Sequence, residues 1–286
     1  MKIGVLLVSL ADEFFAADEQ GAYTCNFQLD DILNKVQNLG ITGLQTYNVG
    51  SEMDPSVLSD DDIRCLKERF NSLGITITAL LGAMNLVDEK NLQQKQSPES
   101  LEGRVQQFKD IIDLGVKLGS PLVTNESGVL SPDDDPKAAW DRFINGMATI
   151  VNHAEKVGGY MCLELGPCSM VNTPDLLDRV MKEINSNHLK INFDPANIIM
   201  AGFDPVENVY RFADKIVHTH AKDAVKGKLE ERPLGQGDVP WPEYLRALKD
   251  IGYNGWLTIE RETGDDPVGD IRLAKEFLEQ QLMEID

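Results

Sequence analysis

The sequence has few of the residues that build disulfide, zinc-ribbon and dithiol redox sites. Only four of its 286 residues are cysteine. They form no CxxC pair, which argues against a zinc ribbon and a thioredoxin-like site, and they are Cys25, Cys65, Cys162 and Cys168. Scattered cysteines of this kind are typical of a protein that keeps its thiols reduced. We therefore expect reduced cysteines and a cytoplasmic location.

Positive charge is also scarce. The chain carries 27 lysine and arginine residues against 47 aspartate and glutamate residues, a formal net charge of −20. Such a charge opposes attraction to nucleic acid and to anionic lipid. No run of about 18 or more apolar residues is present, and the apolar start of the chain turns acidic at Asp12 and Glu13. We expect no nucleic-acid partner, no membrane span and a first strand in place of a signal peptide.

What the chain does contain is a regular alternation of short apolar runs with longer amphipathic ones. Hydrophobic residues make up 42% of the sequence, which is enough for a sizeable core. The short runs predict strands at 3–7, 42–46, 75–81, 122–124, 160–164, 190–194, 215–220 and 255–260. The longer runs predict helices at 29–39, 60–73, 101–118, 136–157, 174–184, 206–213, 241–251 and 271–283.

This alternation predicts a parallel sheet with helical crossovers. Eight strand–helix units in 286 residues fit a (β/α)8 TIM barrel, for which about 250 residues is typical. A doubly wound open sheet competes, but no GxGxxG follows the first strand. No Gly-, Pro- or Ser-rich linker divides the chain, so we predict one α/β domain, a TIM barrel over residues 1–286. The stretch 221–240 is expected to be a long loop without secondary structure.

Each of the last four predicted strands ends in an ionisable residue, and these residues are Glu164, Asp194, His220 and Glu260. Residues two apart share a face of a strand, so this set shares its face with Cys162, Asn192, His218 and Thr258. Bulkier side chains occupy the opposite face at Leu163, Phe193, Val217 and Ile259. We expect the bulky set beneath the helices and the polar set at the C-terminal mouth of the barrel, where such enzymes place their chemistry.

Three carboxylates in one partly desolvated mouth repel one another unless some protonate or a cation binds them. A divalent metal ion is the economical explanation. An oxygen-rich set with one imidazole suits Mn²⁺, Mg²⁺ or Co²⁺, and Zn²⁺ is a further candidate. We predict one such ion on Glu164, Asp194, His220 and Glu260. His218 lies deeper on the same face, and we expect it to hydrogen-bond in the core.

The segments around these residues resemble the xylose isomerase-like family of sugar isomerases and epimerases. They read LELGP, NFDPAN, HTHAKD and TIERE, with PLGQGD between the last two. The likeness to the ketose 3-epimerase branch implies that Glu164, Asp194, His220 and Glu260 hold the metal, usually Mn²⁺, Mg²⁺ or Co²⁺. It also implies that Glu164 and Glu260 move the proton, one on each face of the substrate.

Two positions depart from the ketose 3-epimerase pattern and concern the substrate. Asn197 stands where those enzymes commonly carry a substrate-contacting His, and Met170 stands where they place a second substrate-contacting Glu. The metal set is intact. Apurinic endonucleases share the barrel but need extra histidines for a three-zinc cluster, and this chain has only four histidines in all. With its acidic charge, DNA repair is not expected.

Three further residues are predicted to contact the substrate, namely Asn197, Lys222 and Asn125. Lys222 directly follows the seventh strand, where it either neutralises a substrate oxyanion, phosphate or carboxylate or pairs with Asp223. Asn125 and Glu126 end the fourth strand, where they would bind hydroxyl groups.

The sequence therefore predicts a divalent-metal-dependent isomerase or epimerase of a sugar or sugar derivative. Glu164 and Glu260 would form an acid/base pair that transfers a proton through an enediolate, whose negative charge the metal stabilises. The alternative is a metal-dependent dehydratase, a lyase of the same family acting on an inosose or a dehydroshikimate-like substrate. A non-catalytic sugar-binding barrel is the third interpretation. A homo-oligomer is implied by the resemblance only.

Overall fold

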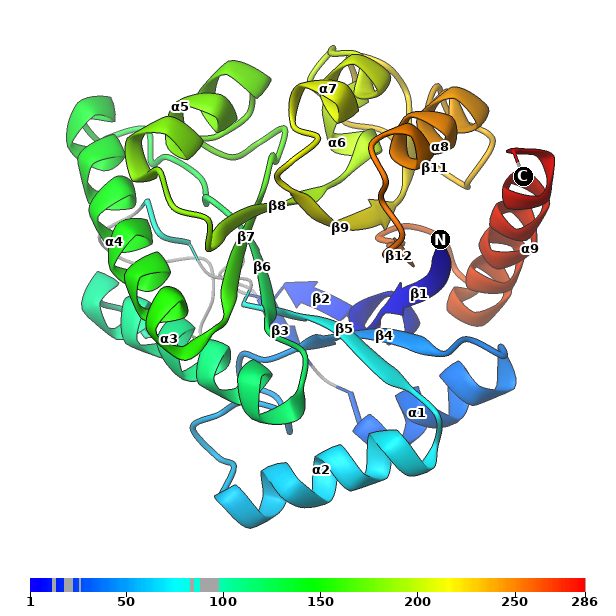
Figure 1. The fold of residues 1–286 in the computed structure, drawn as a ribbon, viewed down its shortest axis with the longest axis horizontal. Coiled ribbons are helices and arrows are strands. Elements are labelled where there is room, and N and C mark those ends of the chain that lie inside the picture. The colour runs from blue at the N-terminus through cyan, green and yellow to red at the C-terminus, as the bar shows by residue number, and fades with distance from the viewer. Residues whose placement is uncertain (12–13, 18–22, 26, 83–84, 88–97, 286) are drawn as a thin grey trace.

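The computed structural model describes residues 1–11, 14–17, 23–25, 27–82, 85–87 and 98–285. Eight parallel strands close into a barrel in the order β1-β12-β9-β8-β7-β6-β5-β4 (Figure 1). They are β1 (Lys2–Leu6), β4 (Gly43–Tyr47), β5 (Thr76–Leu81), β6 (Leu122–Glu126), β7 (Tyr160–Glu164), β8 (Leu189–Phe193), β9 (Ile216–Ala221) and β12 (Trp256–Ile259). The predicted α/β class and (β/α)8 barrel are confirmed. That one domain takes in all of 1–286 stays a prediction.

Helices surround the barrel on its outer side (Figure 1). They are α1 (Leu29–Asn38), α2 (Asp60–Ser72), α3 (Leu101–Leu118), α4 (Pro136–Val157), α5 (Pro174–Ile184), α6 (Pro195–Met200), α7 (Pro205–Arg211), α8 (Trp241–Asp250) and α9 (Pro267–Ile285). A short 3-10 helix, η1 (Leu7–Leu10), follows β1. In the described part of the chain, none of the helices is both long and apolar enough to cross a membrane.

Local sequence signals fix where several helices begin. The Ser59 hydroxyl accepts a hydrogen bond from the Asp62 backbone N–H, and the Asp62 carboxylate accepts one from the Ser59 N–H at 2.9 Å. This reciprocal capping box starts α2. Pro136 occupies the first turn of α4, where its missing N–H costs nothing. Each of these helices follows a strand-to-helix loop, and the capping signal fixes the residue at which the loop ends and the helix begins.

The outward faces of the strands pack beneath the helices, as the alternation predicts. Leu163, Phe193 and Ile259 are buried, and Val217 is half-buried. Phe193 on β8 stacks on Tyr244 of α8, with the ring centroids 5.9 Å apart. The polar set on the same strands is therefore left to face the barrel axis.

The structure adds elements that the sequence does not predict. Helix α6 directly follows β8, and the predicted loop 221–240 contains a small hairpin of β10 (Asp223–Ala224) and β11 (Glu231–Arg232). A second antiparallel pair, β2 (Phe14–Ala17) and β3 (Tyr23–Cys25), follows β1. These elements are too short for periodicity to reveal, because two to six residues do not complete a recognisable pattern.

A candidate metal centre at the barrel mouth

Four neighbouring strands bring the predicted ligands together. Glu164 is the last residue of β7, Asp194 follows β8, His220 lies near the end of β9 and Glu260 follows β12. The strands are consecutive in the closed sheet, so their carboxyl ends meet at one side of the mouth. The four side chains are between 0% and 13% exposed. The barrel thus gathers three carboxylates and an imidazole in a site largely shielded from water.

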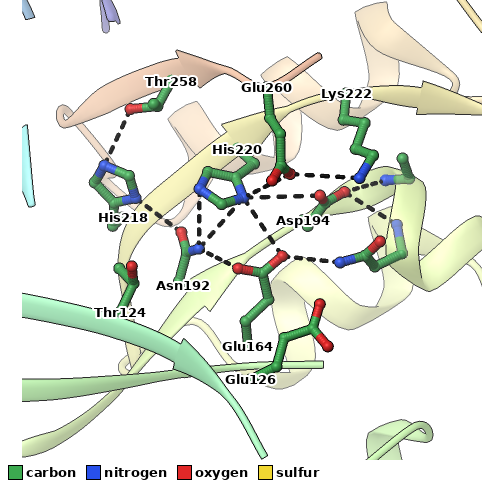
Figure 2. Close-up of polar contacts among 12 residues, drawn as sticks. Thr124, Glu126, Glu164, Asn192, Asp194, His218, His220, Lys222, Thr258 and Glu260 are labelled. Atoms are coloured by element: carbon green, nitrogen blue, oxygen red, sulfur yellow. Dashed lines mark hydrogen bonds and ion pairs between the residues drawn. The ribbon is translucent and has the colours of Figure 1, made fainter. Parts of the chain in front are cut away.

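His220 lies at the centre of this set (Figure 2). Its Nδ1 atom is 3.1 Å from Glu260 Oε2, 3.4 Å from Glu164 Oε1 and 3.8 Å from Asp194 Oδ2. One ligand atom from each of the four residues lies within 4.8 Å of the others. Four donor atoms at this spacing can share one small cation.

Two carboxylate oxygens in the cluster are buried without a hydrogen bond from any described residue. They are Asp194 Oδ2 and Glu260 Oε2. Glu260 Oε2 has ion-pair contacts instead, with His220 Nδ1 at 3.1 Å and Lys222 Nζ at 3.6 Å. The other oxygen of Asp194 is fully used, because it accepts from the backbone N–H groups of Ala196 and Asn197 at 2.7 and 3.0 Å in the first turn of α6. A buried acceptor without a donor is costly. Oxygen donors left over in this way fit a divalent cation.

The charges of the site also fit a cation. Burial raises the pKa of Glu164 to about 8, and the neighbouring His220 opposes this only in part. Burial acts to raise the pKa of Glu260 as well, but the charges of Lys222 and His220 hold that pKa below its usual range. Burial acts to lower the pKa of His220, yet Glu164 and Glu260 raise it well above its usual value. A cation would compete with protons for the same ligand atoms.

A polar network inside the barrel orients His220. Its Nε2 lies 2.9 Å from Gln45 Oε1, and Gln45 Nε2 donates to Thr124 Oγ1 at 2.8 Å. Because the Gln45 amide nitrogen is used by Thr124, its oxygen is the acceptor for His220, so His220 carries its hydrogen on Nε2. Nδ1 is then the nitrogen left for a metal ion, an arrangement that protein metal sites commonly use.

His218 lies below the cluster and is not one of the gathered ligands. Its Nδ1 is 2.8 Å from Asn192 Oδ1, and its Nε2 is 3.0 Å from Thr258 Oγ1 and 3.3 Å from Thr78 Oγ1. Asn192 in turn donates to Glu164 Oε2. Figure 2 shows this chain of contacts running from Thr258 to Glu164. The geometry agrees with the expected role of His218 as a hydrogen-bonded core residue.

Comparison with known proteins identifies the family of the chain. The xylose isomerase-like TIM barrel family matches residues 33–281. The chain belongs to this family. Its relatives include the inosose dehydratase of Geobacillus kaustophilus, 20% identical over 280 residues, which cover 89% of this chain and 87% of the relative. They also include the D-psicose 3-epimerase of Ruminiclostridium cellulolyticum, 26% identical over 211 residues, which cover 71% of this chain and 69% of the relative.

Solved structures agree on the fold of this xylose isomerase-like barrel. A crystal structure of the IolI protein with a zinc atom superposes with a TM-score of 0.76 and 19% identity, covering 100% of this chain and 99% of that one. At that identity the likeness shows the fold alone. The relatives are named as enzymes, both epimerases and dehydratases, and this supports the prediction that the chain is an enzyme.

In this family member Lys222 is buried and pairs with glutamates. Its Nζ lies 2.9 Å from Glu262 Oε1 and 3.6 Å from Glu260 Oε2. The predicted alternative, a pair with Asp223, is wrong. The Asp223 carboxylate turns the other way and accepts four hydrogen bonds, from the N–H groups of Ala224, Gly235 and Val239 and from Trp241 Nε1. Lys222 therefore faces the mouth while Asp223 holds the following loop.

The other predicted substrate contacts have different neighbours in the structure. Asn197 Nδ2 donates to Glu164 Oε1 at 2.8 Å, so Asn197 positions that carboxylate. The Asn125 side chain is buried and donates to the carbonyl of Glu126. Met170 packs against the hydrophobic core. Substrate contacts for Asn197, Lys222 and Asn125 stay predictions.

Sequence reasoning missed the residues that support the cluster from inside the barrel. Gln45 holds His220, and Asn192 holds Glu164. Glu126, which the sequence does single out, ends β6 beside Glu164 in the strand register. The available signal was strand alternation. Asn192 lies two residues before Asp194, and Glu126 lies two residues after Thr124. For Gln45 the sequence gives no comparable signal, because its partner His220 is 175 residues away in the chain.

Proposed function

We propose that the chain is a divalent-metal-dependent isomerase or epimerase of a sugar or sugar derivative. The observation that carries the proposal is the cluster of Glu164, Asp194, His220 and Glu260, in which two buried carboxylate oxygens lack a hydrogen-bond donor among the described residues. These four residues would hold the ion. Mn²⁺ is our first choice, then Mg²⁺ or Co²⁺, with Zn²⁺ suggested by the zinc atom of the IolI structure.

The proposed chemistry is proton transfer next to a carbonyl group. When bound, the ion supplies a Lewis acid that stabilises negative charge on the substrate oxygens. Glu164 and Glu260 are the acid/base pair. Their carboxylates lie on either side of His220 Nδ1, at 3.4 and 3.1 Å, so both would border a substrate bound at the cluster. One carboxylate takes the proton from the carbon, and the other returns it from the opposite face.

Other residues of the mouth would hold the substrate. Asn197 bonds Glu164 and Lys222 lies beside Glu260, so each is close enough to the acid/base pair to contact a molecule bound there. Asn125 is the third proposed contact. A carbohydrate is the expected ligand because the named relatives act on small polyhydroxylated substrates. A cytoplasmic location and a homo-oligomer stay predictions.

A dehydratase is the second candidate. It is favoured by the inosose dehydratase of Geobacillus kaustophilus, which matches 89% of this chain. The same carboxylate would remove the proton, and the second carboxyl would protonate a departing hydroxyl in place of carbon. The product then distinguishes the two, because only the dehydratase yields an unsaturated compound.

Proton exchange in D₂O tests the proposal. The Mn²⁺-loaded protein would be incubated with ketoses, ketose phosphates, inososes and sugar acids, and deuterium located by NMR. We expect deuterium at one carbon of one substrate class, with the exchange abolished by EDTA and reduced at least about 10²-fold in Glu164→Gln and Glu260→Gln. Stoichiometric Mn²⁺ binding without exchange in any compound would favour the non-catalytic sugar-binding barrel instead.

A further inference from the structure

Glu126 is a carboxylate at the mouth that the metal cluster does not use. It ends β6 on the same face as Thr124, whose hydroxyl points into the barrel and accepts from Gln45. The sheet register pairs Glu126 with Glu164 on β7. Figure 2 shows its carboxylate beside the Glu164 side chain. Glu126 therefore faces the space above the cluster but is not one of its four gathered ligands.

One oxygen of Glu126 is held in place by the loop after β7. The hydroxyl of Ser169, itself buried, donates to Glu126 Oε2. Gly166 lies against the same oxygen, and a Cβ atom on Gly166 would overlap it. The loop is tied to the segment just after β6 by a 2.8 Å hydrogen bond from the Met170 N–H to the Gly128 carbonyl. The carboxylate is thus fixed in one orientation.

The other oxygen of Glu126 is available. Glu126 is exposed, whereas Glu164, Asp194 and His220 are buried. Among the residues that the structure describes, none donates a hydrogen bond to Glu126 Oε1. Across the mouth the carboxylate interacts electrostatically with Lys222, Glu260 and Glu262. A molecule bound over the cluster would lie between Glu126 on one side and Lys222 on the other.

We propose that Glu126 is a substrate-positioning residue, whose free oxygen accepts a hydrogen bond from a hydroxyl group of the substrate. This inference rests on the proposed function and deepens it. When ionised, this carboxylate only accepts, so it selects a donor such as a sugar hydroxyl. It also repels an anion. The part of the substrate at Glu126 is therefore a neutral hydroxyl-bearing carbon, and a phosphate or carboxylate group would be excluded from that end.

Binding measurements on Glu126 variants test this proposal without requiring turnover. Apparent dissociation constants of D-psicose, D-tagatose and an inosose would be measured on Mn²⁺-loaded protein by NMR. For the compound that wild-type protein binds, Glu126→Ala is expected to weaken binding about ten- to hundred-fold, the usual effect of losing a hydrogen bond to a charged group. Glu126→Gln keeps an acceptor oxygen and should recover part of the loss.

The controls separate substrate contact from metal binding and folding. Mn²⁺ affinity, measured by calorimetry with the metal alone, is expected to stay within about threefold of wild type in both variants, because Glu126 is not a ligand. Asp133→Asn removes the same charge from an exposed position in the loop between β6 and α4. It is expected to change neither the ligand affinity nor the Mn²⁺ affinity. In a series of analogues that each lack one hydroxyl group, the analogue without the hydroxyl that contacts Glu126 should bind wild-type protein weakly. Its affinity should not fall further in Glu126→Ala.

Three results would overturn the proposal. The first is equal ligand affinity in wild-type and Glu126→Ala protein. The second is a lowered Tm in Glu126→Ala and Ser169→Ala with ligand affinity unchanged, which would leave Glu126 the role of tying down the loop after β7. The third is no binding of any of the three compounds by wild-type protein. Failure of the proposed function looks different, because the ligand would then bind through Glu126 but exchange no deuterium.

Discussion

At the scale of single residues, the candidate centre depends on how His220 is held. One ring nitrogen faces all three carboxylates, and the other is 2.9 Å from Gln45 Oε1. An imidazole held in this way loses little freedom when it binds a metal ion, and its basicity is raised by the acceptor behind it. Gln45 should therefore matter to metal affinity although it lies outside the cluster.

We predict that Gln45→Leu lowers Mn²⁺ affinity about ten- to hundred-fold, the usual effect of removing the acceptor behind a metal-binding imidazole. Calorimetric titration of the metal-free protein measures this directly. Gln107→Leu is a matched control, because Gln107 is also a buried glutamine but its amide donates to Asp54 and not to a residue of the cluster. It should lower Tm and leave Mn²⁺ affinity unchanged. Equal affinities in all three proteins would refute the role of Gln45.

Residue-level prediction from the sequence succeeds where strand alternation applies. Glu164, Asp194, His220 and Glu260 end successive parallel strands, so their clustering follows from the strand pattern alone. The sequence predicts hydroxyl binding by both residues that end β6 and favours Asn125 as the substrate contact, yet Asn125 is buried and Glu126 is exposed on the inward face. The same alternation rule, extended two residues beyond Thr124, would have favoured Glu126.

At the scale of elements, the connection from β9 to α8 is held by one carboxylate. Asp223 is fully buried and accepts hydrogen bonds of 2.9–3.1 Å from three backbone N–H groups and from the Trp241 indole. Gly237 packs so closely on the carboxylate that a Cβ atom there would overlap it. This anchor fixes the β10–β11 hairpin and with it the side of the mouth next to Lys222.

We predict that Asp223→Asn loosens this connection, because the amide nitrogen of asparagine faces N–H donors that it cannot bond. Trypsin should cut after Lys226 or Lys228 about tenfold faster or more, as expected for a local opening that has become easier. Asp238→Asn is the control, since among the described residues the Asp238 carboxylate accepts one hydrogen bond, of 2.8 Å, from the Lys226 N–H. Its cleavage rate should change much less. Mass spectrometry of the fragments locates the cuts.

The capping box of α2 gives a pH-dependent prediction. Hydrogen bonds from the Ser59 hydroxyl and backbone lower the pKa of Asp62 in the folded protein. A lowered folded-state pKa means that Asp62 stabilises the fold above the unfolded-state value of about 3.9 and that this contribution is lost as the pH falls through the folded-state value. The Tm difference between wild-type protein and Asp62→Asn should be present at neutral pH and vanish in acid.

Thermal unfolding followed by circular dichroism, at neutral pH and at a pH below the folded-state pKa of Asp62, measures this difference. Asp61→Asn, on the same turn of α2 but bonded to Arg64 and not to Ser59, reports the effect of merely removing a charge there. A Tm difference for Asp62→Asn that persists unchanged in acid would contradict the assigned role of the carboxylate.

Helices and strands could be predicted from the sequence where their apolar pattern runs over enough residues to be recognised. The predicted strand 160–164 and helices 101–118, 136–157 and 174–184 match the observed bounds, since each has a clear apolar pattern or capping signal. Helix α6 and the β10–β11 hairpin were not predicted. Helix α6 has six residues and the two strands of the hairpin have two each, so neither shows an apolar pattern. The local contacts that hold them, from Asp194 to the first turn of α6 and from Asp223 to the Gly235 N–H, leave no periodic signal in the sequence.

At the scale of the whole molecule, the barrel encloses a negative charge that works against its own stability. The chain has a net charge of −20, and three of its carboxylates converge within the cluster. Bringing like charges together in a desolvated site costs free energy, and a divalent cation offsets that cost. Because the unfolded chain lacks the converged site, the ion should bind the folded state selectively and raise its stability.

We predict that Mn²⁺ at about 100 times its Kd stabilises the protein by about 2.7 kcal/mol, which corresponds to a rise in Tm of roughly 5 °C or more. EDTA should reverse the rise, and Glu260→Gln should abolish most of it because one ligand is lost. Asp133→Asn removes the same charge outside the cluster and should keep the rise in Tm. Differential scanning calorimetry with Mn²⁺, Mg²⁺, Co²⁺ and Zn²⁺ ranks the ions. If none of them moves the Tm of wild-type protein, the four gathered side chains do not form a metal centre, and the proposed chemistry fails with it.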